Sequence, residues 1–414
     1  MRPVIWFVLL FAVAVVAALT LGDNRGLASF YWNSWRLDLS LNFFLLAAIA
    51  IGFAVVSAVQ AINALVGLPQ RAREWRALQR ERAAQAALRE ALTEYFAGRY
   101  SRAHKAAQRA ITVHDDVEVL HEDHGFMVLA HVLAAGSLHR LQDRARRDQL
   151  LQRAFKAGRK AGPAAVDDGA RLLAAEWALD DRDGARAEQL LSELQPGVAR
   201  RTHALRLKLQ AARLQRRPLE ALHTARLLAN HQAFTAVAAQ ALLRALAFEA
   251  LDEAHDADQL RRVWQQFDDA DQRDPFVAAR AARRAAALGA AEDGRAWLRP
   301  LWERMEALGL DGRAQVALAL VDAAAGVGPD WLPRVEAAQR AWPTEAAVQA
   351  AAGAVFVDRQ LWGKARRPLE QAAADVALEA RARRQAWRAL AHLAGEEGDD
   401  ERANACHRAA AAID

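Results

Sequence analysis

The sequence predicts an all-α protein, with two N-terminal transmembrane helices followed by a solenoid of paired helices. Three observations support this prediction: two long uncharged runs near the N-terminus, a group of arginines directly after the second run, and a remainder of Ala-, Leu- and Arg-rich stretches separated by short turns. The apolar fraction of 53% excludes an intrinsically disordered chain. At roughly 150 residues per domain, the 414 residues suffice for several globular units or for one long repeat array.

The first uncharged run covers residues 4–21 and is rich in Val, Leu, Ala and Phe. As a helix it would be about 27 Å long at 1.5 Å per residue, close to the ~30 Å hydrocarbon core of a bilayer. A cleaved signal peptide would need its small-residue cleavage pattern after the apolar stretch, but Ala12 and Ala14 come too early. We therefore predict an uncleaved membrane anchor.

The second uncharged run extends from residue 39 to residue 70 and is most apolar between Phe43 and Val59. It is long enough to cross a bilayer. The loop between the two runs is rich in aromatic rings, which favour the headgroup layer because they combine an apolar body with a polar group. Residues 1–70 are thus predicted to form a membrane anchor with a short external loop. The aromatic residues of this loop are Phe30, Tyr31, Trp32 and Trp35.

An arginine-rich segment follows the second run. Residues 71–112 contain ten basic and four acidic side chains, whereas residues 113–414 have a net charge of −2. Positive charge beside a span marks its cytoplasmic end, so we predict that the C-terminal domain lies in the cytoplasm and the loop outside. Contact of these arginines with anionic lipid headgroups explains the net charge of +5 without a nucleic-acid partner. The predicted lipid-proximal residues are Arg71, Arg73, Arg76, Arg80 and Arg82.

The rest of the chain predicts a helical repeat array. It shows no sustained period-2 alternation, and its apolar stretches of about 12–18 residues are broken by Gly, Asp or Pro turns. We assign residues 71–112 to a juxtamembrane helix and first repeat, and residues 113–414 to the array, with irregular repeats across 113–165 and 230–290. Pro218 and Pro368 are expected at or near helix starts, where the missing N–H is tolerated.

Small residues recur in this array with a period near 34. Ala187 and Ala221 lie 34 residues apart, and the segment Trp387–Ala391 is followed twelve residues later by Ala403. Small side chains let two antiparallel helices approach closely. The units resemble tetratricopeptide repeats, so we predict a tetratricopeptide-like α-solenoid whose concave face binds peptides or protein segments. The predicted packing residues are Ala103, Ala187, Ala221, Gly353, Ala365, Trp387, Ala391 and Ala403.

The N-terminal region resembles HemY-type proteins of proteobacterial inner membranes. The resemblance rests on the segments LDLSLNFFLL at 37–46, LPQRAREW at 68–75 and AGRYSRA at 97–103. It covers residues 1–110, and the remainder is similar only as generic repeats. The resemblance implies a multi-pass bacterial inner-membrane protein with tetratricopeptide repeats that is associated with haem (protohaem IX) and porphyrin metabolism, rather than a defined reaction.

The same family name is also used for an unrelated flavin-dependent protoporphyrinogen oxidase, which the sequence does not support. Such an enzyme needs a G-x-G-x-x-G motif between a strand and a helix. The nearest segment, Gly326-Val-Gly328-Pro329, lacks the third glycine. No other catalytic motif occurs, and the lone Cys406 excludes an intrachain disulfide and a thiolate zinc site. We therefore predict no catalytic residue and no metal site.

Two groups of side chains are candidate haem ligands. His121 and His124 are three residues apart and would share a helix face. The alternative is a polar helix start, because acidic neighbours such as Asp123 suit a helix N-terminus. Cys406 and His407 form a potential ligand pair, the alternative being ordinary packing of the last helix.

Three functional hypotheses follow. The first is an inner-membrane-tethered scaffold or regulator of haem biosynthesis that binds pathway enzymes on its cytoplasmic array. The second is a protein or enzyme that handles haem directly through His121, His124 or His407. The third, an envelope scaffold unrelated to haem, shares every feature except the family resemblance.

Overall fold

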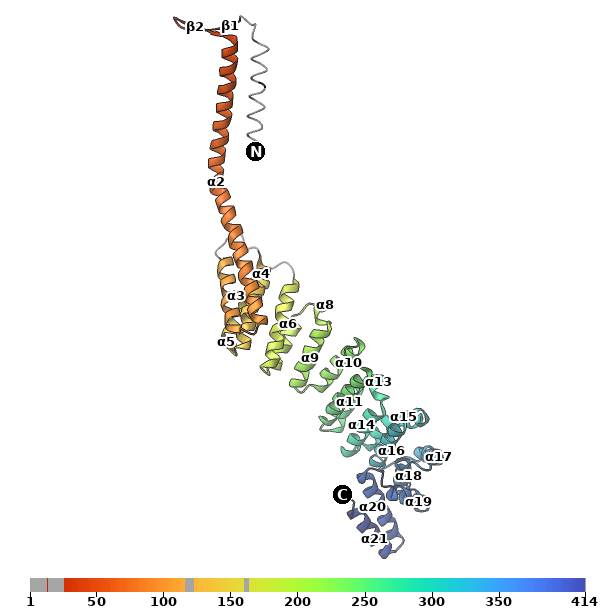
Figure 1. The fold of residues 1–414 in the computed structure, drawn as a ribbon. Helices are drawn as coiled ribbons and strands as arrows, with labels where there is room; N and C mark the ends of the chain where they lie inside the picture. Colours follow the sequence, from red (N-terminus) through yellow and green to blue (C-terminus); the bar gives the residue numbers. More distant parts are fainter. Residues whose placement is uncertain (1–12, 14–25, 116–122, 160–163, 414) are drawn as a thin grey trace. The chain divides into compact units, whose positions relative to one another are not determined.

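The computed structural model describes residues 13, 26–115, 123–159 and 164–413. These residues form a two-stranded antiparallel sheet and twenty α-helices (Figure 1). The chain divides into two compact units, residues 1–160 and 161–414. The first predicted membrane span, residues 4–21, lies outside the described residues except for Val13.

The predicted external loop is a β-hairpin, which the sequence analysis did not foresee. Strand β1 covers Leu27–Trp32 and strand β2 covers Trp35–Ser40, with Trp32 opposite Trp35. The two-residue turn between them places Asn33 at φ 51°, a left-handed conformation that Asn tolerates well. Alternating apolar side chains and a cross-strand Trp pair favour this hairpin over an irregular loop.

A single 56-residue helix, α2 (Leu41–Phe96), connects the hairpin to the helical part of unit 1. The Ser40 side chain caps it by accepting a hydrogen bond from the Phe43 N–H. Among the described residues, Leu41–Ile62 is the one helical segment long and apolar enough to cross a membrane, with a mean hydropathy of 2.4. The helix continues without interruption past residue 70, the predicted end of the anchor.

Three shorter helices follow the charged half of α2, and each packs mainly against the helix before it. The first of them is antiparallel to α2, and Arg109 forms an ion pair with Glu90 at an N–O distance of 2.7 Å. Alanines such as Ala103 and Ala107 are fully buried there, because small side chains allow close helix approach. The three helices are α3 (Tyr100–Asp115), α4 (His124–Arg140) and α5 (Arg144–Gly158).

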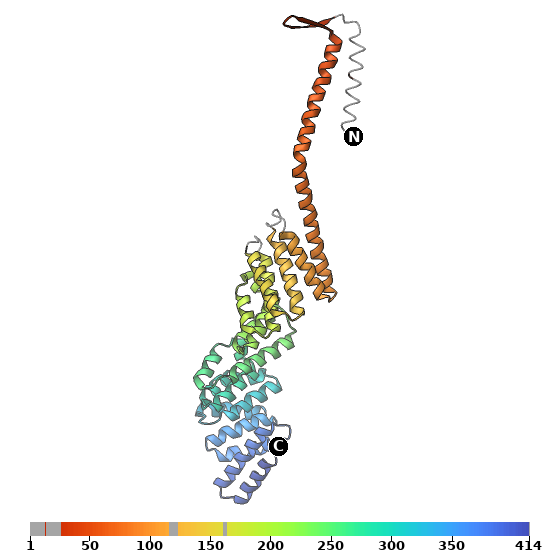
Figure 2. The same cartoon turned by 90° about the vertical axis from the view of Figure 1, so that its left-hand side faces the viewer.

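Unit 2 consists of seven helix pairs (Figure 2). The first helices of successive pairs begin 34 to 39 residues apart, and the longest interval, across 236–275, contains the extra short helix α13 (Asp269–Gln272). The pairs are α6 (Ala164–Asp180) with α7 (Gly184–Ser192), α9 (Thr202–Leu214) with α10 (Pro218–Asn230), α11 (Ala236–Asp252) with α12 (Ala257–Gln265), α14 (Pro275–Ala287) with α15 (Ala291–Trp302), α16 (Leu310–Asp322) with α17 (Leu332–Ala341), α18 (Ala346–Asp358) with α19 (Trp362–Ala374), and α20 (Ala380–Glu396) with α21 (Asp400–Ala411).

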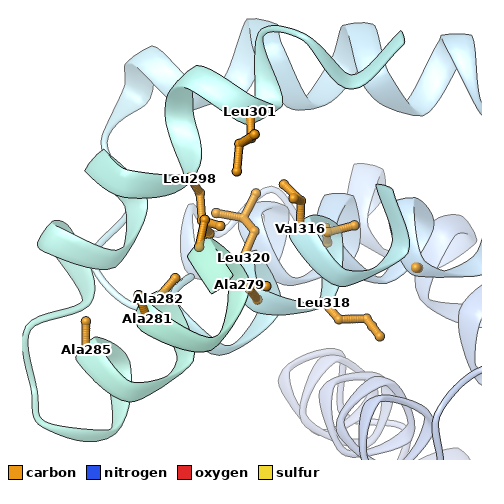
Figure 3. Close-up of a cluster of buried hydrophobic side chains, with 14 of the residues drawn as sticks. Ala279, Ala281, Ala282, Ala285, Leu298, Leu301, Val316, Leu318 and Leu320 are labelled. Atoms are coloured by element: carbon orange, nitrogen blue, oxygen red, sulfur yellow. The ribbon is translucent and has the colours of Figure 1, made fainter. Parts of the chain in front are cut away.

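Small residues allow the helices of a pair to pack closely. A Cβ added to Gly294 in α15 would lie 2.9 Å from the carbonyl oxygen of Ala282 in α14, so only glycine fits there. Leu298 and Leu320 are fully buried beside this crossing (Figure 3). Among the predicted packing residues, Trp387 and Ala403 are half-buried. The other six, Ala103, Ala187, Ala221, Gly353, Ala365 and Ala391, are buried.

Most pairs share one type of connecting turn. After α4, the Gln142 N–H bonds to the His139 carbonyl and the Asp143 N–H to the Leu138 carbonyl, both at 3.0 Å, which is the Schellman pattern. Asp143 then caps α5 by accepting from the Arg146 N–H at 3.1 Å. The residues at the left-handed position of these turns are Gly98, Gln142, Arg182, Arg216, Gly289, Gln360 and Gly398.

The two prolines expected near helix starts differ in position. Pro218 is the first residue of α10, as predicted. Pro368 instead lies inside α19 as its seventh residue and is buried. The expectation for Pro368 was wrong because burial of this helix against its neighbours outweighs the lost backbone hydrogen bond.

Candidate functional site

Unit 1 contains a pocket of about 450 Å³ that is lined by three histidines. It lies where the end of α3, the start of α4 and the end of α5 meet. We name it the histidine pocket. Its described lining residues are His114, Asp115, His124, Met127, His131, Arg153, Lys156 and Ala157.

Helix α4 supplies three of these side chains at one face. His124, Met127 and His131 follow one another at spacings of three and four residues. The Nδ1 of His131 lies 2.7 Å from the Met127 carbonyl oxygen and therefore donates to it, which leaves the lone pair of the neutral ring at Nε2. Burial lowers the pKa of His131, so the ring is neutral at physiological pH.

His114 is held by aromatic stacking. Its ring lies parallel to that of Phe126, with a centroid distance of 4.9 Å and an interplanar angle of 6°. It is 3% exposed. His114 thus forms a fixed wall of the pocket, in contact with the start of α4.

The rim of the histidine pocket is positively charged. Arg153 and Lys156 lie one turn apart on α5, and both are exposed. Asp115 is the one carboxylate among the described lining residues. The excess of positive charge favours an anionic ligand, and a carboxylate can pair with the Arg153 guanidinium.

The pocket brings together residues that the sequence analysis only partly identified. His124 lines it, whereas His121 lies outside the described residues. We missed His131 although it lies seven residues after His124, a spacing that places both on the same helix face. No group of three or more metal-ligating side chains occurs among the described residues.

The second candidate ligand pair does not converge on one site. Cys406 is buried, and burial raises the pKa of its thiol, so it stays protonated. His407 is exposed. Neighbouring helical residues point about 100° apart, which explains why the two side chains face different surroundings.

Unit 2 contains a second candidate site, a groove of about 690 Å³ between α6 and α9. We name it the α6–α9 groove. Leucines form much of its wall, and Leu214 is 41% exposed there. Phe234, in the connection after α10, closes one end. The apolar lining residues are Leu179, Leu207, Leu209, Leu214 and Phe234.

Charges of both signs surround this apolar wall. Glu176 and Asp180 lie on α6 and Arg182 lies in the turn after it, whereas Arg206 lies on α9. The Arg206 guanidinium donates to the Ala233 carbonyl oxygen at 3.5 Å. An apolar groove with charges of both signs around it suits a protein segment that presents an apolar side chain between charged ones.

The predicted lipid-proximal arginines belong to α2. Arg76, Arg80 and Arg82 are exposed on this helix. The side chains of Arg71 and Arg73 lie outside the part of the chain that the structure describes.

Comparison with known proteins identifies the N-terminal region. Residues 26–122 match the family model described as HemY protein N-terminus. No curated protein matches the chain. A solved structure, "Structure of Naa15/Naa10 bound to HypK-THB", is 14% identical, with coverage of 78% of this chain and 57% of that chain and a TM-score of 0.25. The chain thus spans just over half the length of that protein, and the TM-score is too low to support a common architecture.

The family match covers the hairpin, α2 and α3. Of these elements, α3 contributes His114 and Asp115 to the histidine pocket. The match agrees with the resemblance found in the sequence and with the apolar segment at Leu41–Ile62. Residues 26–122 are therefore similar to the N-terminal region of HemY proteins, which supports an association of the chain with haem biosynthesis and with a membrane.

Proposed function

We propose that this protein is an inner-membrane-tethered scaffold or regulator of haem biosynthesis that binds pathway enzymes on its helical array. The observation that supports this most directly is the α6–α9 groove, with exposed Leu214 between charges of both signs. Arrays of helix pairs bind protein segments on such surfaces. Small residues such as Gly294 at the helix crossings support the tetratricopeptide-like array that this role requires.

Tethering adds to this function without any catalytic residue. Attachment through α2 confines bound enzymes to a layer near the bilayer, where hydrophobic porphyrins partition, and so raises their effective concentration. The arginines after Leu41–Ile62 favour a cytoplasmic location for the array. An active alkaline phosphatase fused to the C-terminus would contradict this topology, because that enzyme matures only outside the cytoplasm.

Site-specific crosslinking tests the groove. A photoreactive side chain at position 214 of the full-length protein in native membranes should crosslink to a haem-pathway enzyme. The matched control is position 227 on α10, because Leu227 is 38% exposed but does not line the groove. Leu214→Asp should abolish affinity capture of the same enzyme, whereas Leu227→Asp should retain it.

Two outcomes would contradict the scaffold. In one, an intact tethered bait captures no haem-pathway protein. In the other, Leu214→Asp and Leu227→Asp capture it equally well. A tetrapyrrole profile of a deletion strain that equals the parent profile would favour an envelope scaffold unrelated to haem.

A second candidate function is direct binding of haem or another porphyrin in the histidine pocket. The observation that favours it is His131, a neutral imidazole whose Nδ1 is fixed by the Met127 carbonyl. Its Nε2 is the atom that an iron would take as axial ligand. Arg153 and Lys156 on the rim would pair with porphyrin carboxylates.

Haem titration distinguishes this second function. The full-length protein in nanodiscs should show a saturable Soret shift beyond that of empty nanodiscs, and His131→Ala should remove it. His407→Ala is the matched control, because His407 is exposed on α21 and lines no part of the pocket. A Soret shift that survives His131→Ala would place any bound haem elsewhere.

A further inference from the structure

The β-hairpin before α2 has two chemically different faces. In its register, Phe30 lies opposite Leu37 and Trp32 opposite Trp35. Because side chains alternate between the faces of a strand, these four residues share one face. Together with Ala28 opposite Leu39, they make that face entirely apolar. Trp32 and Trp35 are 84% and 82% exposed.

The other face of the hairpin carries polar side chains that pair with one another, together with Leu27 opposite Ser40. Tyr31 lies opposite Arg36, and the Arg36 guanidinium lies 5.6 Å from the centre of the Tyr31 ring. Ser29 donates a hydrogen bond to Asp38, which also forms an ion pair with Arg36 at 2.9 Å. These bonds hold the pKa of Asp38 below its usual value, so the carboxylate stays charged. The charged and hydroxyl groups of this face make it suited to contact with water.

The contact between the hairpin and α2 determines which face points along the helix. The ring of Phe30, on the apolar face, lies 5.3 Å from that of Phe44 in the first turn of α2. The Leu41 N–H also donates to the Gly26 carbonyl at 3.0 Å, so both ends of the hairpin are held at the helix start. The hairpin projects sideways from there (Figures 1 and 2). Its apolar face is therefore on the side of the apolar segment Leu41–Ile62.

We propose that this hairpin lies flat on the outer leaflet of the bilayer, with its apolar face buried at the lipid interface and its polar face in water. When α2 crosses the membrane, the hairpin lies at the end of the span, and the face bearing Trp32 and Trp35 meets the boundary between headgroups and acyl chains. Indole rings favour this layer. The aromatic residues thus divide between two environments, because Tyr31 belongs to the water-facing side.

Nitroxide labels on the full-length protein test the two faces. The native Cys406 is first removed by Cys406→Ala, and single labels are attached through Leu37→Cys on the apolar face and Tyr31→Cys on the polar face. A third label at Ile49→Cys reports the span, since Ile49 is 51% exposed on α2. Each protein is reconstituted in vesicles of phosphatidylethanolamine and phosphatidylglycerol, and collisions with oxygen and with a water-soluble nickel chelate are measured.

We expect the ratio of oxygen to nickel collisions to be several-fold higher at position 37 than at position 31, and highest at position 49. Equal ratios at 31 and 37, with free access of nickel to both, would overturn the proposal. Position 37 shielded from both reagents would also overturn it, because protein rather than lipid would then cover the apolar face. Free access of the nickel chelate to position 49 would also overturn it, because α2 would then not span the bilayer at that position.

Discussion

The chain contains two apolar helices whose surroundings are opposite. The segment Leu41–Ile62 of α2 is apolar on all sides, and none of it is buried by the protein. Helix α18 (Ala346–Asp358) is also apolar on all sides, yet nine of its residues are buried. At 1.5 Å per residue, the 13 residues of α18 extend about 20 Å, too short for a hydrocarbon core of ~30 Å. Hydropathy alone does not separate the two environments, whereas length does.

Side-chain size separates the two helices as well. Twelve of the 22 residues of Leu41–Ile62 are Leu, Ile, Val or Phe, whose large side chains suit contact with lipid. Seven of the 13 residues of α18 are Ala or Gly, which allow neighbouring helices to approach. The one buried polar residue of α18, Gln349, donates to the Trp342 carbonyl at 3.1 Å at the end of α17. The NH2 group of the Gln349 amide is thus satisfied locally, whereas its Oε1 is buried without a hydrogen-bond partner.

A cavity in α18 should have the largest effect on stability among the changes that test this contrast. Phe356 is fully buried, so Phe356→Ala should destabilise unit 2 by about 3–5 kcal/mol. Hydrogen exchange of the α18 amides measures the loss. Phe43→Ala in α2 is the control, because Phe43 is 58% exposed and should leave that exchange unchanged. Equal protection of α18 in both variants would mean that the core around Phe356 is not closely packed.

A charge in the middle of α2 should have the next largest effect. Ile51→Arg places a cation near the centre of the apolar segment, where insertion of Arg costs about 2.5–3.5 kcal/mol. We expect less protein in the membrane fraction, with unit 2 still folded. Leu310→Arg is the matched control, because Leu310 is 63% exposed at the start of α16 and should not change fractionation. Unchanged fractionation of Ile51→Arg would count against a span at this position.

Two glycines allow a direct comparison between the helices. A Cβ on Gly353 of α18 would lie 2.6 Å from the Cγ of Leu369 on α19, so Gly353→Ala should cost about 1–3 kcal/mol. A Cβ on Gly52 of α2 would meet nothing within 4 Å. Gly52→Ala should therefore be neutral or stabilise the helix by up to about 1 kcal/mol. Thermal unfolding monitored by circular dichroism should show a lower midpoint for Gly353→Ala alone.

The smallest expected effect concerns the turn that ends α18. Gln360 occupies a left-handed conformation with φ 57°, which costs a residue with a Cβ about 1 kcal/mol. Gln360→Gly should raise the thermal midpoint of unit 2 slightly. Gly398→Ala, at the equivalent turn after α20 with φ 77°, should lower it. If both changes lower the midpoint, the Gln360 side chain contributes more than its backbone strain costs.

The sequence predicted the helical array well because each helix has a local signal. Apolar spacing, Gly and Asp at the turns, and small residues such as Ala187 and Ala221 recur within every 40 residues or so, and these signals depend little on distant contacts. The HemY-type domain was also recognisable, since its motifs lie in short continuous segments. The second apolar run was predicted from length and hydropathy, which agree at Leu41–Ile62.

The remaining features depend on contacts between elements. The β-hairpin was read as a loop because its six-residue strands are short and its aromatic residues suggested only a membrane interface. The histidine pocket requires α3, α4 and α5 to meet, and no local pattern joins His131 to Arg153. Pro368 illustrates the same limit, because the packing of α19 overrides a local helix-breaking preference.

The unbroken length of α2 sets the height at which each group stands above the membrane. For a helix along the bilayer normal, Arg71 lies about 13 Å beyond Ile62, whereas Arg82 lies about 30 Å beyond it. The headgroup layer occupies only about 5–8 Å of this distance, and the surface potential falls off over a further ~8 Å at physiological ionic strength. If Leu41–Ile62 spans a membrane, we therefore expect positions 80 and 82 to interact more weakly with anionic lipids than the positions nearer the span. With Leu41–Ile62 in a membrane, α2 would thus act as a spacer that places the helices after it beyond the reach of the lipid surface charge.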